Sequence, residues 1–244
     1  MMNVICRPDE RDWYNLPPYS GDYITALDGG VKGLRVAFSA DLGSDAPVDP
    51  EVAASVRDAG DVFRRLGATV EEVTIDPALQ ERGHRSYLVV RCVMQRGLLR
   101  RLSPEQQALM DPDLLSTCNE NVFDLDAYTD AEQERRLFGV EFNLLLNKYD
   151  ILLCPTVHTL PERVEAKSPE PYLTLLFNFS RHPALSIPCG LSVSGLPIGV
   201  QLVAAHYREP LLLGAAAAYE AEHGFPKLPI GLPPASSSSV VPHA

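Results

Sequence analysis

The chain has 244 residues, which corresponds to one large domain or two small ones at about 150 residues per domain. Hydrophobic residues make up 45 % and charged residues 22 %, and these values exclude a disordered chain for all but the ends. The net charge of −11 repels nucleic-acid phosphates and anionic lipids, and no stretch is apolar for long enough to span a bilayer. The first residues also lack the pattern of a signal peptide. We therefore expect a cytoplasmic globular protein without nucleic-acid or membrane partners.

The first third of the chain is typical of a strand, a helix and a second strand. Residues 33–38 alternate apolar and polar side chains, as a strand does. Asp49 is a suitable helix N-cap, apolar residues then follow at helical spacing, and Gly67 suits a helix C-terminus. Residues 69–75 again have the composition of a strand. Such a unit joins two parallel strands.

Helices are expected in the middle of the chain. An apolar and basic pattern predicts one over residues 86–102, and the capping box at 103–106 predicts the start of another. A second capping box at 129–132 predicts a helix that begins at Thr129 and ends near Tyr149.

The last third of the chain is expected to contain three strands and a helix, at residues 150–154, 185–188, 198–203 and 209–223. A turn at 192–195 separates the last two strands and permits antiparallel pairing. Residues 233–244 have the composition of a flexible tail. The alternation of helices and strands predicts one α/β domain over residues 1–232.

No self-contained catalytic signature is present, since the nucleophile elbow, the phosphate loop, the dinucleotide fingerprint and the zinc-protease helix are all missing. Cys154 with His158, and His182 with Cys189, supply too few ligands for zinc, so we predict neither a metal site nor a cofactor. The five cysteines are widely spaced and odd in number, which favours reduced thiols. These patterns predict a fold class and no reaction.

Four segments nevertheless stand in a recognisable order. They are RPDERD at residues 7–12, the strand and helix of 33–38 and 47–66, YDILLCPT at 149–156, and FNFSRHPALSIPCGLSVSGLPIGVQLV at 177–203. The last is similar to the pattern FNxTGQPAxSxPxG…GLPVGxQxV of the amidase signature family. That family consists of amide-bond hydrolases and includes the A subunits of the aminoacyl-tRNA amidotransferases. The chain thus resembles this family over most of its length, up to about residue 230.

The resemblance implies the C-terminal portion of the amidase-signature fold, a mixed β-sheet covered by α-helices. It also implies a hydrolase in which a partly neutral lysine accepts a proton through a bridging serine from a nucleophilic serine. In the family these three residues precede the segment that residues 7–12 resemble. The resemblance therefore assigns no catalytic residue here, and we expect this chain to be inactive alone.

Four substrate-binding residues are implied by the resemblance. Thr174 and Phe177 match a Thr-x-x-aromatic-Asn step that forms the wall of the acyl pocket, while Asn178 and Thr156 would support the site. An equally weighted alternative is that Thr156 and Asn178 only satisfy backbone groups at a strand end.

Arg181 and His182 replace the Gly-Gln of the family pattern, which puts the entrance shape and the substrate preference in question. Three functions stay open for the chain. The first is the substrate-pocket half of an amidase, which acts on a small amide once an N-terminal half completes it. The second is a non-catalytic remnant that binds ligands or a partner. The third is a relative of the amidotransferase A subunit. A sheet cut in two exposes a strand edge and an apolar patch, so we expect low solubility, self-association or a partner chain.

Overall fold

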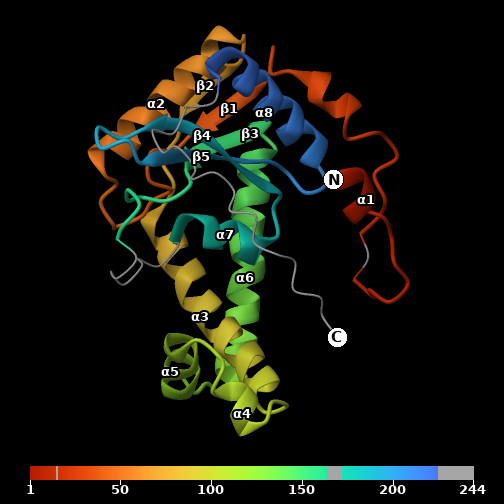
Figure 1. Cartoon of the computed structure of the whole chain (residues 1–244), viewed down its shortest axis with the longest axis vertical. Coiled ribbons are helices and arrows are strands. Elements are labelled where there is room, and N and C mark those ends of the chain that lie inside the picture. Colours follow the sequence, from red (N-terminus) through yellow and green to blue (C-terminus); the bar gives the residue numbers. More distant parts are fainter. Residues whose placement is uncertain (15, 164–171, 225–244) are drawn as a thin grey trace, which may run out of the picture.

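The computed structural model describes residues 1–14, 16–163 and 172–224. Within them lies a mixed sheet of five strands in the order β2-β1-β3-β5-β4 (Figure 1). The strands are β1 (Arg35–Phe38), β2 (Thr69–Glu72), β3 (Ile151–Pro155), β4 (Ala184–Leu191) and β5 (Pro197–Val203). β1 pairs in parallel with β2 and β3, and β5 pairs antiparallel with β3 and β4. The predicted α/β fold with a mixed sheet is confirmed, whereas the tail at 233–244 lies outside the described residues.

Helices cover both faces of the sheet (Figure 1). One face carries α2 (Pro50–Arg65) and α8 (Glu209–His223), and the other carries α3 (Pro77–Leu99), α6 (Leu125–Leu146) and α7 (Tyr172–Ser180). The remaining helical segments are short: α1 (Met2–Ile5), the 3-10 helix η1 (Thr25–Gly29), α4 (Pro104–Gln107) and α5 (Pro112–Glu120). None of the helices in the described ranges is long and apolar enough to cross a membrane.

The predicted strand–helix–strand unit is confirmed by β1, α2 and β2. The Asp49 carboxylate accepts a hydrogen bond from the Glu51 N–H at 2.8 Å, so it caps α2 as its sequence position indicates. Gly67 follows the helix with φ of +94°, a left-handed conformation that glycine adopts without strain. The second strand is shorter than expected, because pairing with β1 ends at Glu72.

Two predicted helix starts were wrong. The capping box at 129–132 does not open a helix: α6 begins at Leu125, and Asp124 caps it by accepting from the Ala127 N–H at 2.8 Å. Thr129 lies inside α6, where its hydroxyl donates to the Asp126 carbonyl at 2.9 Å. Likewise α3 begins at Pro77, well before residue 86, because the Asp76 side chain caps it there. The capping box at 103–106 does open α4.

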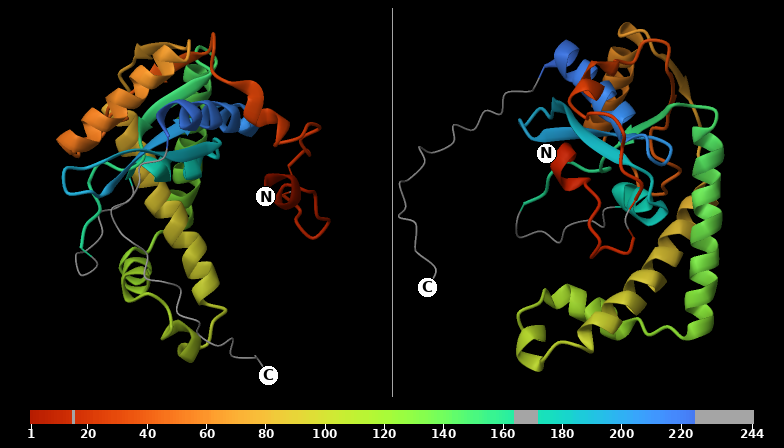
Figure 2. Two further views of the ribbon diagram at one scale, coloured as in Figure 1. Left: turned by 45° about the horizontal axis from the view of Figure 1, so that its top comes forward. Right: turned by 90° about the vertical axis from the view of Figure 1, so that its right-hand side faces the viewer.

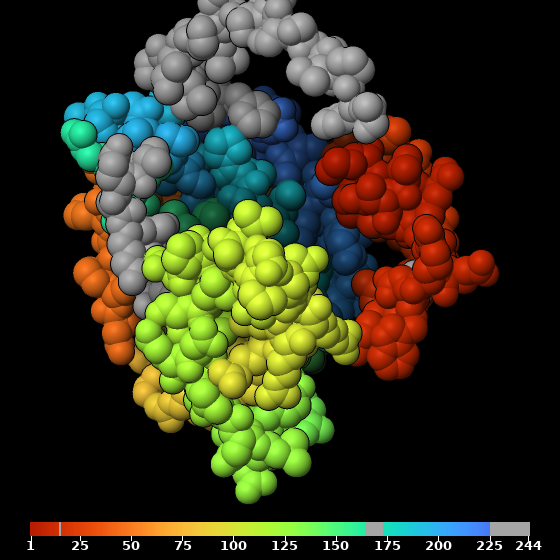
Figure 3. All heavy atoms as spheres, turned by 60° about the horizontal axis from the view of Figure 1, so that its bottom comes forward, coloured from red at the N-terminus to blue at the C-terminus, as the bar shows by residue number. Residues whose placement is uncertain are grey.

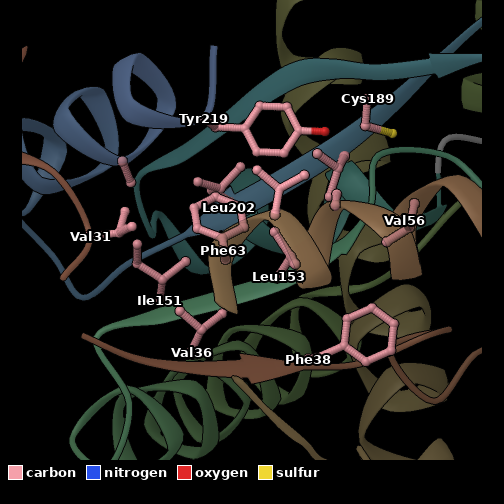
Figure 4. Close-up of a cluster of buried hydrophobic side chains, with 14 of the residues drawn as sticks. Val31, Val36, Phe38, Val56, Phe63, Ile151, Leu153, Cys189, Leu202 and Tyr219 are labelled. Atoms are coloured by element: carbon pink, nitrogen blue, oxygen red, sulfur yellow. The ribbon is translucent and has the colours of Figure 1, made fainter. Parts of the chain in front are cut away.

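A separate hydrophobic core lies on each face of the sheet. Between the sheet and α2 and α8, the rings of Phe63 and Tyr219 stack with their centroids 5.5 Å apart, and Leu202 of β5 belongs to the same cluster (Figure 4). On the opposite face, Phe138 and Phe142 of α6 pack with side chains of α7 and of the sheet. The two cores hold the strands between helices and leave β4 at one edge.

An arm made of α3 and α6 extends beyond the sheet and carries α4 and α5 at its far end (Figure 2). Seen from that end, the arm stands in front of the sheet, and the N-terminal segment lies to one side (Figure 3). The arm joins the sheet through the second core, where α3, α6 and α7 meet.

Gly83 of α3 lies close to side chains of α6 and α7 in that junction. A β-carbon at this position would lie 2.7 Å from Cε2 of Phe138 and 3.2 Å from Cδ2 of Leu176, which would force α3 away from α6 and α7. We expect Gly83→Ala to lower the free energy of unfolding in urea by about 1–3 kcal/mol. A β-carbon at Gly97 of the same helix would meet no atom of the described residues within 4 Å apart from its chain neighbours and the backbone of the helix itself. Gly97→Ala is therefore the matched control and should raise that free energy by about 0.5–1 kcal/mol; equal effects would contradict the packing.

Candidate functional site

Two hydroxyl groups from separate strands meet on the sheet face that carries α7. Thr156 directly follows β3, Ser186 lies in β4, and β5 runs between these two strands. The Thr156 Oγ1 and the Ser186 Oγ are nevertheless only 2.7 Å apart. Gly199 of β5 leaves the necessary room, because a β-carbon there would lie 3.0 Å from the Thr156 oxygen and 3.1 Å from the Ser186 oxygen. The pair is accessible: Ser186 is exposed and Thr156 is half-buried.

The side chains next to this hydroxyl pair on the same face of the sheet are buried. Gln201 of β5 donates from Nε2 to the Cys154 sulfur at 3.5 Å, and both side chains are inaccessible. Burial raises the pKa of the Cys154 thiol to about 12, with the Gln201 contact acting weakly in the opposite direction. Cys154 is therefore a neutral thiol at pH 7 and not a nucleophile. No group of three or more His, Cys, Asp or Glu side chains in the described ranges is placed to hold a metal ion.

The four residues expected to bind substrate occupy three different environments. Thr156 contacts Ser186, as described. Thr174 and Asn178 are one helical turn apart on α7, half-buried and exposed respectively, so they share one side of that helix. Phe177 is 1 % exposed and packs edge-on against Phe142 at a centroid distance of 5.1 Å. Lining of a substrate pocket by these residues stays a prediction.

Ser186 was not among the predicted site residues, although the sequence contains a signal for it. Leu185 and Ile187 pack into the core beneath α2 and α8. Because side chains alternate along a strand, Ser186 must point to the opposite face, toward the α7 side. Alternation along residues 184–191 places this hydroxyl on the same face as Thr156, but only the register with β5 brings the two side chains together.

The Arg181-His182 dipeptide forms the turn after α7. His182 is 4 % exposed; its Nδ1 is 2.9 Å from the Ser180 hydroxyl, its Nε2 is 3.2 Å from Oδ1 of Asn143, and its ring lies 4.1 Å from that of His206. Burial, and then the charge of His206, lower the pKa of His182 to about 4. His182 is thus a neutral structural residue at pH 7. Arg181 has φ of +63°, and this left-handed conformation explains why a glycine suits the position.

Gly199→Ala should separate the two hydroxyl groups. The added β-carbon meets both oxygens at distances below ordinary van der Waals contact, so we expect the free energy of unfolding in urea to fall by about 1–2 kcal/mol. Ser186→Ala removes one exposed hydrogen bond and should cost at most about 1 kcal/mol. In the double variant the missing Ser186 oxygen makes space, so the two costs should not add. Additive costs would show that the methyl group does not meet the hydroxyl pair.

Comparison with known proteins agrees with this architecture. The amidase family model matches residues 1–213. The chain is 29 % identical to the glutamyl-tRNA(Gln) amidotransferase A subunit of Myxococcus xanthus, across 92 % of this chain and 52 % of that protein. Two solved structures are each 25 % identical to it. A bacterial aryl acylamidase of the amidase signature enzymes superposes with a TM-score of 0.71 over 88 % of this chain and 48 % of its own. A 6-aminohexanoate cyclic dimer hydrolase superposes with a TM-score of 0.70 over 90 % of this chain and 51 % of its own.

The chain therefore spans about half the length of the relatives it matches. Neither the sheet order nor the hydroxyl pair identifies a family, but the family match covers nearly all of the described fold. By the extent of that match, the chain belongs to the amidase signature family.

Proposed function

We propose that this chain supplies the substrate-pocket half of an amidase that hydrolyses a carbon–nitrogen bond of a small amide. The observation that carries the proposal is the extent of the match to the amidotransferase A subunit from Myxococcus xanthus, 92 % of this chain against 52 % of that protein. In this proposal the nucleophilic serine and its base come from an N-terminal half, whether that half is joined to this chain or is a separate polypeptide.

Surfaces on this chain support a second half as its partner. Trp13 is 84 % exposed and Val193 is 97 % exposed, so each presents apolar surface that a partner can bury. β4 is the last strand in the sheet order, with no further strand of the described residues beside it, and its Ser186 side chain is exposed. A further α/β half that pairs with this edge would extend the sheet beyond β4.

The Thr156 and Ser186 hydroxyls give this half a chemical role. Each can donate one hydrogen bond and accept others, so together they can hold the carbonyl oxygen or the N–H of an amide beside a nucleophile. Holding the amide in one orientation lowers the entropic cost of the attack. Polar residues on the outer side of α7, Thr174 and Asn178, would extend the same pocket.

Complementation tests the proposal. Ammonia release from a panel of aliphatic and aryl amides is measured for this chain alone, for an N-terminal half of the family alone, and for the two mixed. A fluorophosphonate probe with mass spectrometry reports any reactive serine. We expect turnover and labelling only in the mixture, with the labelled serine on the added half. Turnover by this chain alone, or no turnover in the mixture, would contradict the proposal; ligand binding without turnover would favour a binding scaffold.

Two serine variants test whether Ser186 contributes to substrate binding in the active mixture. In the active mixture, Ser186→Ala should lower kcat/KM about tenfold or more, because the substrate loses one orienting hydrogen bond in the transition state. Ser116→Ala is the matched control, since Ser116 is an exposed serine of α5 at the far end of the arm. Equal activity of the two variants would remove Ser186 from the pocket.

Glutamine is a specific candidate substrate within this proposal. The Myxococcus xanthus relative is the A subunit of a glutamyl-tRNA(Gln) amidotransferase, so glutamine belongs in the amide panel. Preference for glutamine over simple amides would favour a role within an amidotransferase. Preference for aryl or aliphatic amides would favour a stand-alone amidase.

A further inference from the structure

Two thiols face one another where α5 packs on α3, far from the hydroxyl pair. Cys92 of α3 and Cys118 of α5 are both fully buried and free. The Cys118 thiol donates to Oε1 of Gln95 at 3.1 Å, and the Cys92 sulfur is 3.9 Å from the Thr117 carbonyl oxygen. Thr117 directly precedes Cys118, and Gln95 lies one turn after Cys92. The two contacts therefore place both sulfurs between α3 and α5, each facing the other helix.

The attachment of α5 is slight. Of its nine residues, all of which the structure describes, Cys118 alone is buried. Its carbonyl also accepts a hydrogen bond from the Arg96 guanidinium at 2.9 Å. A helix of this length has little stability of its own, so contacts with α3 must hold it in place. With so small a buried surface, we expect undocking of α5 to cost little free energy and to uncover both thiols.

Undocking also changes the reactivity of Cys92. Burial and the neighbouring Cys118 raise its pKa, while Arg91 and Arg96 act in the opposite direction. When α5 moves away, Cys92 loses the influence of Cys118 and part of its own burial. Arg91 and Arg96 belong to α3, so they stay close to Cys92. The pKa of Cys92 should therefore fall when α5 moves away. The thiolate that forms beside two guanidinium groups is the nucleophile for thiol–disulfide exchange.

We propose that Cys92 and Cys118 are a redox-sensitive thiol pair, which a low-molecular-weight disulfide converts into a disulfide joining α3 to α5. The Cys92 thiolate attacks one sulfur of the oxidant, and the first thiolate leaves and takes a proton. The Cys118 thiolate then attacks the Cys92 sulfur of the mixed disulfide and displaces the second thiolate, which is protonated in turn. Two protein thiols are oxidised, one small disulfide is reduced to two small thiols, and the two protons are conserved.

The consequence is a covalent clamp at the far end of the arm. In the reduced chain α5 exchanges between docked and undocked states, and in the oxidised chain it is held on α3. This proposal does not depend on amide hydrolysis, because it concerns residues that lie outside the hydroxyl-pair site.

Oxidised glutathione tests the pair in the full chain. Cys6 is exposed and would react first, so the experiment uses the Cys6→Ser background, which keeps the four buried thiols. After incubation at pH 8, we expect titratable thiols to fall from four to two, the intact mass to fall by two hydrogens, and peptide mapping to join Cys92 to Cys118. Dithiothreitol should restore the starting mass. Hydrogen exchange of the α5 amides should slow in the oxidised form.

Two further thiols and one variant serve as controls. Cys154 and Cys189 are buried in the sheet, and burial raises the pKa of each to about 12, so they should stay reduced. Cys118→Ser removes the second nucleophile, and Cys92 should then retain a glutathione adduct. The proposal is overturned if Cys92 and Cys118 stay reduced, if they oxidise no faster than Cys154 and Cys189, or if a glutathione adduct persists on Cys92 in place of the disulfide.

Discussion

Replacing Phe142 with alanine should lower the free energy of unfolding by about 3–5 kcal/mol, the largest effect we expect from a single substitution. The Phe142 ring is 1 % exposed, and its centroid lies 5.0 Å from that of Phe138 and 5.1 Å from that of Phe177. It also lies 6.2 Å from the His182 ring, so one side chain joins α6, α7 and the turn after α7. Alanine would leave a cavity among rings that cannot all move inward. Urea unfolding followed by circular dichroism measures the loss.

Leu144 provides the matched control for this substitution. It lies on the same helix but is 52 % exposed, so Leu144→Ala should change the free energy of unfolding by no more than about 0.5 kcal/mol. Hydrogen exchange in α7 should accelerate in Phe142→Ala and not in Leu144→Ala, because only Phe142 contacts α7 through Phe177. Similar costs for the two variants would mean that the α6–α7 contact is not the centre of this core.

Stability should fall as the pH is lowered from about 6.5 toward 4, and His182 should cause up to about 3 kcal/mol of that fall. In the folded chain, burial and the neighbouring His206 lower the pKa of His182 to about 4, whereas an unfolded histidine titrates near 6.5. Below pH 6.5 the unfolded chain therefore binds a proton that the folded chain does not. The folded state loses about 1.4 kcal/mol per pH unit across this window. Urea unfolding at pH 7, 6, 5 and 4.5 measures the slope.

His182→Gln isolates this histidine from other titrating groups. Glutamine can keep a hydrogen bond toward Asn143 or Ser180 and carries no titratable proton. We expect the variant to be less stable than the natural chain at pH 7, with a difference that shrinks as the pH falls toward 4.5. The carboxylates whose pKa values are lowered, such as Asp9 at about 2, contribute to both chains alike and mainly below this window. Parallel curves for the two chains would show that His182 is not kept neutral by burial.

The amino-acid sequence by itself determined the features that depend on neighbouring residues. Asp49 and Gly67 bound α2 because capping uses backbone groups within a few residues. The fully apolar run before Pro155 fits a strand buried on both faces, and it forms β3. The family was also identifiable from a continuous pattern at residues 177–203. This segment forms the end of α7 and the strands β4 and β5.

The tertiary structure decided the features that depend on residues far apart in the chain. Asp124 and Thr129 can both cap a helix, and Asp124 is used because the extra turn lets Ala127 and Tyr128 pack against the second core. Phe177 matches a pocket-wall pattern, and the fold adds that its ring is buried against Phe142. The contact between Thr156 and Ser186 exists only because β5 lies between their strands and places Gly199 under both hydroxyls. Sequence patterns indicate the preference of a segment for helix, strand or turn. Strand order and register bring distant side chains together, and they follow from burying the two cores at once.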